Sequence, residues 1–188
     1  KNKLAESELR RTQKFLDTVI EHVPLPIVVK SAPNSTQDAL DCQFTLVNRA
    51  FEELTGDSRF KLIGKSASEL YPRERAERIA ASDRETLESR VAVLTREHPI
   101  PTAHNNTRLV SAKKVAIRDD DGKPQYLLSL LDDVTDRRRS EQRIAHMAHY
   151  DSLTDLPNRA AFNECFAVTL ERAAANKEQF SILSVDLD

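Results

Sequence analysis

Two apolar runs joined by a tight turn limit the folds open to this chain more than any other feature. The runs cover residues 107–117 and 125–131, and the sequence Asp-Asp-Asp-Gly-Lys-Pro at 119–124 lies between them. An Asp-Gly pair between two such runs is a strong signal for a β-hairpin. The chain is therefore expected to contain an antiparallel sheet, around which its other segments must be placed.

Three further segments are typical of strands: residues 27–29, residues 42–47, and a run from Val91 to Leu94 that extends toward Ile100. Residues 48–89 instead have a helical pattern that is broken by glycines and a proline, which favours several short helices over one long one. The pattern predicts an α+β fold with one five-stranded antiparallel sheet and helices on one of its faces.

Helices are also expected on both sides of this unit. In residues 4–23, Leu9, Leu16 and Val23 recur at seven-residue steps, which favours an amphipathic helix that pairs with a second copy of itself. We assign residues 1–20 to this dimerisation helix, and Pro24 and Pro26 end the helical run. After the sheet, residues 136–150 are predicted to form a charged signalling helix.

The overall charge narrows the class of partner. The net charge of −2 provides no electrostatic reason to expect nucleic acid or an anionic membrane. No apolar run reaches the roughly 18–20 residues that span a bilayer, so a membrane anchor would have to lie outside residues 1–188.

Cys42 and Cys165 lack the spacing of a zinc or redox motif, and reduced cysteines fit a cytoplasmic protein.

Residues 21–135 resemble a PAS domain. The resemblance is carried by Phe-Thr-Leu-Val-Asn-Arg-Ala-Phe at 44–51, Leu-Thr-Gly at 54–56, Leu-Ile-Gly-Lys at 62–65 and the exit Asp-Asp-Val-Thr-Asp-Arg at 132–137. It implies a sensor domain with space for a ligand between sheet and helices.

Residues 151–188 resemble the opening part of a GGDEF domain, the α/β domain of diguanylate cyclases. The run Asp-Ser-Leu-Thr-Asp-Leu-Pro-Asn-Arg at 151–159 has every fixed residue of that family's opening motif, and residues 180–188 resemble its first core strand. The resemblance implies GTP as substrate, Mg²⁺ as cofactor and a homodimer. It also implies that Asp186 is a metal ligand and that Leu187 contributes its backbone carbonyl. From the residues alone, a solvated strand end remains the alternative.

The chain lacks other parts of a cyclase. It contains three glycines and no adjacent pair, so the GG(D/E)EF loop is not in residues 1–188. We therefore predict no catalytic residue here, and no activity for these residues alone. One helix, from Arg159 to about residue 177, and one strand are not expected to bury a core unaided. Asp151 and Arg159 are predicted to form a structural ion pair, with separate cap and surface charges as the alternative.

The ligand of the sensor is not identified by the sequence. A flavin-adduct cysteine motif and a helical axial histidine are both absent, which argues against flavin and haem, and His98 and His104 are expected in loops. Four arginines, Arg73, Arg75, Arg78 and Arg84, could gather around an acidic metabolite. A solvated helix face with ion pairs such as Glu74–Arg78 is the interpretation that we favour.

Two functions fit these features. In the first, a PAS sensory and dimerisation module regulates a diguanylate cyclase that converts two GTP to cyclic di-GMP in bacterial signal transduction. In the second, a non-catalytic ligand-binding and dimerisation module precedes a degenerate GGDEF domain, and a downstream EAL phosphodiesterase could be the regulated enzyme.

Overall fold

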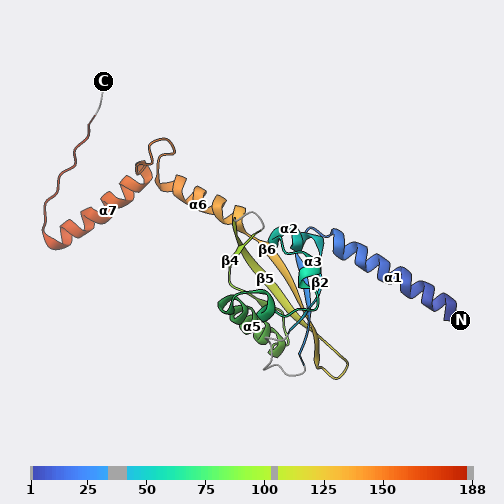
Figure 1. The fold of residues 1–188 in the computed structure, drawn as a ribbon. Coiled ribbons are helices and arrows are strands. Elements are labelled where there is room, and N and C mark those ends of the chain that lie inside the picture. Colours follow the sequence, from blue (N-terminus) through green and yellow to red (C-terminus); the bar gives the residue numbers. More distant parts are fainter. Residues whose placement is uncertain (1, 34–41, 103–105, 186–188) are drawn as a thin grey trace. The chain divides into compact units, whose positions relative to one another are not determined.

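The computed structural model describes residues 2–33, 42–102 and 106–185. Its contacts divide the chain into two compact units, Lys1–Thr135 and Asp136–Asp188, each of which is described by itself (Figure 1). Within the described ranges, no helix combines the length and the apolar character needed to cross a bilayer.

The first unit contains an antiparallel sheet, and the predicted α+β fold is confirmed. Its strands are β1 (Ile27–Ser31), β2 (Phe44–Val47), β3 (Val93–Leu94), β4 (His98–Pro101), β5 (Thr107–Arg118) and β6 (Pro124–Asp133). The strand order is β2-β1-β6-β5-β3, with β4 also paired to β5. The predicted hairpin joins β5 and β6, and Gly122 adopts the positive φ of 79° that its turn requires.

The sheet has six strands rather than the predicted five, because the run expected from Val91 toward Ile100 forms two short strands. Between them, the Thr95 backbone N–H donates to Ala112 O at 2.8 Å. The Thr95 hydroxyl oxygen accepts the Ala112 N–H at 2.8 Å, so a side chain replaces a backbone carbonyl in the ladder. Pro99, which has no N–H, lies in β4 at the edge of the sheet, where its missing donor is tolerated.

Short helices connect the two parts of the sheet, as the broken pattern predicts. They are α2 (Arg49–Thr55), α3 (Arg59–Leu62), α4 (Ala67–Leu70) and α5 (Arg73–Glu88). The predicted N-terminal helix is α1 (Asn2–His22). Helix α6 (Thr135–His149) begins at the last residue of the first unit, and α7 (Arg159–Asn176) belongs to the second. Gly56 ends α2 with a left-handed φ of 74°, which only glycine adopts at low cost.

Asn48 joins α1, β1 and α2 at one buried point. Its side-chain oxygen accepts from Ile27 N at 2.9 Å and from Phe51 N at 3.1 Å, and the second bond caps α2. Its amide nitrogen donates to the carbonyls of Ile20 at 3.0 Å and Leu25 at 2.9 Å. Because Asn48 is fully buried, its own polar atoms cannot be satisfied by water and depend on these bonds.

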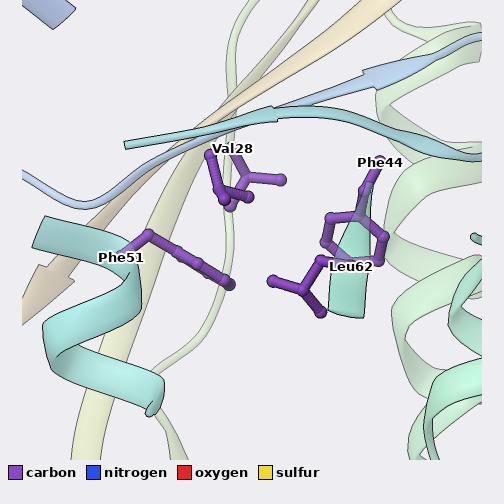
Figure 2. Packing of buried hydrophobic residues seen from close by; sticks show 5 residues of the cluster. Val28, Phe44, Phe51 and Leu62 are labelled. Carbon is purple, nitrogen blue, oxygen red and sulfur yellow. The ribbon is translucent and has the colours of Figure 1, made fainter. Parts of the chain in front are cut away.

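The apolar core lies between the sheet and the short helices. Figure 2 shows Val28 of β1, Phe44 of β2, Phe51 of α2 and Leu62 of α3 pointing toward one another. A second cluster contains Cys42, Leu87 and Leu127 and connects the end of α5 to β6. Fully burying side chains of this size stabilises the fold by about 1.5–3 kcal/mol each.

The opposite face of the sheet is apolar but only partly covered. Neighbouring strands pair Val29 and Val115 with Leu128, and Ile117 with Tyr126, so these side chains share one face. Ile117 and Tyr126 are 44% and 42% exposed.

Candidate functional site

A cavity of about 600 Å³ lies in the first unit between the sheet and α5. Its apolar wall includes Val28, Phe44 and Phe51 of the core cluster that Figure 2 shows. The remaining apolar lining comes from α5 and from the later strands, including Ile79, Ile100 and Leu131. Cavities of this size and composition hold small molecules in many proteins.

The polar end of this cavity is formed by two lysines that share one carboxylate. Lys30 Nζ of β1 lies 2.6 Å from one oxygen of Asp83, and Lys114 Nζ of β5 lies 2.7 Å from the other. Asp83 belongs to α5 and is 1% exposed, and the lysines are 5% and 9% exposed. Two ammonium groups and one carboxylate are thus removed from water together, which we call the Lys30–Asp83–Lys114 triad.

The electrostatics of the triad follow from burial and from its unequal charges. Burial acts to raise the pKa of Asp83, but the two ammonium groups outweigh it and hold that pKa below 3.8. Burial lowers the pKa of Lys114, and the attraction of Asp83 offsets this only in part. The Lys30 ammonium also lies 4.8 Å from the centre of the Phe44 ring, a cation–π contact.

The arginines of α5 largely follow the prediction of a solvated helix face, because Arg73, Arg78 and Arg84 are exposed and Arg75 is partly buried. Arg75 and Arg78 line the cavity, and the Arg75 guanidinium stacks 3.9 Å from the centre of the Tyr71 ring. Burial is the main reason that the pKa of Tyr71 rises to about 12. On the solvated face, Arg73 pairs with Glu77 at 2.7 Å.

The histidine prediction is wrong for His98. This residue does not lie in a loop. It belongs to β4, where it pairs with Val110 of β5, and it lines the cavity. The β-propensity of Ile100 and the long partner strand outweigh Pro99 and Pro101, which follow His98, since edge strands tolerate proline. His104 lies outside the described residues.

The exit of the PAS-like unit is fastened to the sheet. The Asp133 carboxylate accepts from Thr135 N at 3.0 Å, which caps the start of α6. The Thr135 hydroxyl oxygen accepts from Leu109 N at 2.8 Å, and Val134 N donates to Leu109 O at 2.9 Å. Val134 and Thr135 are both buried, so the predicted exit motif holds the first residue of α6 against β5.

In the second unit, Asn158 of the GGDEF-like opening motif connects two helices. Its side-chain oxygen accepts from Ala160 N and Ala161 N, at 2.9 and 3.1 Å, and so caps the start of α7. Its amide nitrogen donates to Met147 O and Ala148 O, at 3.3 and 3.1 Å, in the last turn of α6. One side chain therefore satisfies unpaired backbone groups at the ends of both helices.

The predicted Asp151–Arg159 ion pair is not formed. The Asp151 carboxylate instead accepts from the backbone N–H of Leu153 and of Thr154, at 3.2 and 3.0 Å, and from the Thr154 hydroxyl. Those hydrogen bonds from Thr154 and Leu153 lower the pKa of Asp151. A local turn competes better here because Asp151 reaches N–H groups two and three residues away without ordering a long arginine side chain.

The predicted final strand is also not formed over the residues that the structure describes. Residues 178–185 have no regular secondary structure, and Leu183 and Val185 are 87% and 71% exposed. A strand needs a partner for its backbone groups, and α7 cannot supply one. Asp186 and Leu187, the predicted metal ligands, lie with Asp188 outside the described residues.

Sequence reasoning missed the Lys30–Asp83–Lys114 triad, although signals for it exist. Asp83 occupies the apolar stripe of α5, at helical spacing from the buried residues Ala76, Ala80 and Leu87. Lys30 lies on the buried side of its strand, two residues after Val28. A charge at a core-facing position requires a partner, and opposite charges on neighbouring elements could have been matched.

Comparisons with known proteins follow the same division of the chain. Residues 21–139 match the family described as PAS fold. Residues 148–188 match the family described as diguanylate cyclase, GGDEF domain.

Two curated relatives from cyclic di-GMP signalling are similar to this chain. A diguanylate cyclase of Vibrio cholerae serotype O1 is 27% identical over 128 residues, which are 68% of this chain and 40% of that protein. The cyclic di-GMP phosphodiesterase PdeR of Escherichia coli K12 is 28% identical over 182 residues, which are 96% of this chain and 26% of that protein. The chain therefore spans less than half the length of either relative.

Among solved structures, the PAS domain of an HTR-like protein from Haloarcula marismortui has a TM-score of 0.52 and 17% identity. The match covers 70% of this chain and 98% of that one. At this identity the similarity concerns the fold.

Proposed function

Because the chain belongs to the PAS fold family over residues 21–139, we propose that it is the sensory and dimerisation part of a cyclic di-GMP signalling protein, and that its PAS domain regulates a diguanylate cyclase. The observation that carries the proposal is the order of the two matched families. The opening of a GGDEF domain follows the PAS domain at residue 148, and α6 covers the residues that join them.

In this proposal, the cavity receives the signal and α6 transmits it. The triad connects α5 to β1 and β5, and β5 also holds the start of α6 through Leu109. A ligand that changes the position of α5 against the sheet therefore has a path of direct contacts to the exit. Coupling between two sites in a protein is typically about 1–3 kcal/mol.

The proposed chemistry belongs to the GGDEF part. A diguanylate cyclase joins two GTP molecules, so two GTP sites must face each other and dimerisation is part of the mechanism. Asp186 and the Leu187 carbonyl are the proposed Mg²⁺ ligands, and the support for them is that hard cations prefer oxygen donors.

The proposed homodimer would use α1 and the outer face of the sheet. Leu9, Phe15 and Leu16 of α1 are 61%, 65% and 50% exposed, which is unusual for apolar side chains of this size on one helix. The partly covered residues of β5 and β6 add a second apolar surface, and a second copy of the chain could cover both.

The second candidate function is control of a phosphodiesterase through a degenerate GGDEF domain and an EAL domain. The observation that favours it is that the alignment with the E. coli phosphodiesterase PdeR covers 96% of this chain.

One assay on the natural full-length protein separates these candidates. The protein is incubated with Mg²⁺ and GTP, and separately with cyclic di-GMP, and the products are identified by mass spectrometry. We expect cyclic di-GMP from GTP, and we expect Asp186→Asn to abolish it while Asp120→Asn, in the exposed hairpin turn, does not. Hydrolysis of cyclic di-GMP without synthesis would favour the second candidate, and neither reaction would contradict both.

A further inference from the structure

The charges that line the cavity do not balance. Five of its lining side chains are cationic and one, Glu85, is anionic; the cations are Lys30, Arg75, Arg78, Arg96 and Lys114. The whole chain carries a net charge of −2, so this excess of positive charge is local to the cavity. A positive, partly apolar cavity attracts small anions and repels cations.

At the buried end, the imbalance is one charge. Lys30 and Lys114 each contact an oxygen of Asp83, and together they leave one positive charge without a buried counterpart. An uncompensated charge in a site away from water is costly, so a bound monoanion would be strongly favoured there. Burial is the main cause that lowers the pKa of Lys114, and the repulsion from Lys30 acts in the same direction.

Ser82 provides a second, independent observation at the cavity. Its hydroxyl oxygen is inaccessible to solvent and has no hydrogen-bond partner. Among the described residues, it is the buried side-chain oxygen or nitrogen for which this holds. Ser82 precedes Asp83 on α5 and lines the same cavity as Lys30 and Lys114. Such an orphaned hydroxyl is rare in native structures, and a rotation of the Ser82 side chain toward the cavity would let it donate to a ligand oxygen.

The rest of the cavity limits what carries the negative charge. Val28, Phe44, Phe51 and Ile79 form an apolar wall next to the lysines, so a bare inorganic ion would leave most of the space unfilled. At the buried end, where one charge is missing, a dianion such as a phosphate ester would carry one negative charge too many. The wall and the charge together fit a carboxylate that is attached to an apolar alkyl or aryl body.

We propose that this cavity binds a small organic monocarboxylate, whose carboxylate contacts Lys114, Lys30 and Ser82 and whose apolar body packs on β1, β2 and α2, an assignment that rests on the proposed sensory function. The test measures binding alone and needs no cyclase activity. A failure here would therefore leave the proposed regulation of cyclic di-GMP synthesis intact, and the reverse is also true.

The first experiment compares acids with their neutral amides on the 188-residue chain. Titrations by calorimetry use 1-naphthaleneacetate against 1-naphthaleneacetamide, and octanoate against octanamide, so that a flat and a flexible body are both tried. We expect at least one acid to bind at least about tenfold more tightly than its amide, because the amide keeps the shape and loses the charge. Equal affinities within both pairs, or no binding of either acid at about 1 mM, would overturn the proposal.

The second experiment removes the unbalanced charge and keeps the fold. Lys114→Met leaves the Lys30–Asp83 pair neutral, so the variant should fold, and the acid that binds should lose about tenfold in affinity with little change for its amide. Lys113→Met is the matched control, because Lys113 is exposed on the same strand and points to the other face. If both variants lost affinity equally, or neither did, the assignment to this cavity would be wrong. The comparison of acid with amide on the unmodified chain decides the proposal even if Lys114→Met unfolds.

Discussion

At the scale of single residues, Asp83 has the largest predicted effect on stability. It is the single carboxylate between two buried ammonium groups, and both of its oxygens are used. Asp83→Asn would leave two cations buried without a counter-charge, and removing one partner of a buried ion pair typically costs about 3–5 kcal/mol. We expect a loss of this size in urea unfolding at neutral pH.

The matched control for this prediction is Asp120→Asn, since Asp120 is exposed in the β5–β6 turn. A surface substitution of this kind should change the free energy of unfolding by less than about 0.5 kcal/mol. If Asp83→Asn changed the free energy of unfolding as little as this control does, the triad would not be formed in solution.

The triad also predicts the direction of acid destabilisation. The pKa of folded Asp83 lies below 3.8, so its carboxylate stabilises the fold above pH 3.8, and this contribution is lost as the pH falls through the folded pKa. Between pH 7 and about pH 3, wild type should therefore lose more unfolding free energy than Asp83→Asn, which cannot titrate. Parallel pH profiles of the two proteins would contradict this.

The sequence revealed least about buried polar residues that bond to distant parts of the chain. The motif around Phe44–Phe51 predicted the domain, but it did not reveal that Asn48 satisfies backbone groups of three elements. That role depends on carbonyls more than twenty residues away, such as Ile20 O. Hydrogen bonds between distant residues form only in the packed fold, so a local sequence pattern does not predict them.

At the scale of elements, the exposed side of α1 leads to a prediction about assembly. Leu9 and Leu16 lie one above the other on the helix and are both at least half exposed. If a second copy covers them, Leu9→Asp with Leu16→Asp should convert a dimer to a monomer, because each buried leucine contributes about 1.5–3 kcal/mol. Light scattering measures this directly.

Lys14→Asp is the control, because Lys14 lies on the other side of α1 and the substitution also introduces a negative charge. Val23, which the seven-residue pattern includes, is a weaker probe since it is partly buried within its own domain. A monomeric wild type at high concentration, or a double variant that stays dimeric, would exclude pairing through this face.

A second element-scale prediction concerns the joint between α6 and α7. Asn158→Ala removes the cap of α7 and the donors to the end of α6, and losing a helix cap costs about 1 kcal/mol. We expect faster hydrogen exchange at the N–H groups of Ala160 and Ala161 and lower helicity by circular dichroism. Asn163→Ala, at an exposed position inside α7, should instead keep or raise the helicity.

Helices and strands were predicted well where turn residues and periodicity agree. They were predicted poorly where the pairing with another segment determines whether a strand forms. The β5–β6 hairpin and the broken helices of residues 48–89 follow from turn residues and periodicity, and both are present. The run from Val91 to Ile100 was expected to be one strand, but the Thr95 side chain takes over a ladder bond and divides it. The apolar run at 180–185 has strand-like composition, but in the part of the chain that the structure describes no strand pairs with it.

At the scale of the whole molecule, the sequence motifs indicated a PAS-like part and a GGDEF-like part, and both families are matched, over residues 21–139 and 148–188. Each motif combines several fixed residues over a short span, so such recognition needs no long-range contact. The cavity is different, because its lining comes from β1, β2, α2, α5 and later strands. Its charge imbalance could be seen only after these elements were brought together.

The division of the chain leads to a last prediction, which concerns catalysis by residues 1–188 themselves. Synthesis of cyclic di-GMP requires a loop that holds GTP, and the family's version of this loop begins with two adjacent glycines. The three glycines here, Gly56, Gly64 and Gly122, all precede residue 148, where the match to the GGDEF family begins. We therefore expect no cyclic di-GMP when this chain is incubated with GTP and Mg²⁺, while the natural full-length protein in a parallel reaction produces it. Product from residues 1–188 would show that GTP is held by other residues, and the proposed division between a sensor part and a catalytic part would then be wrong.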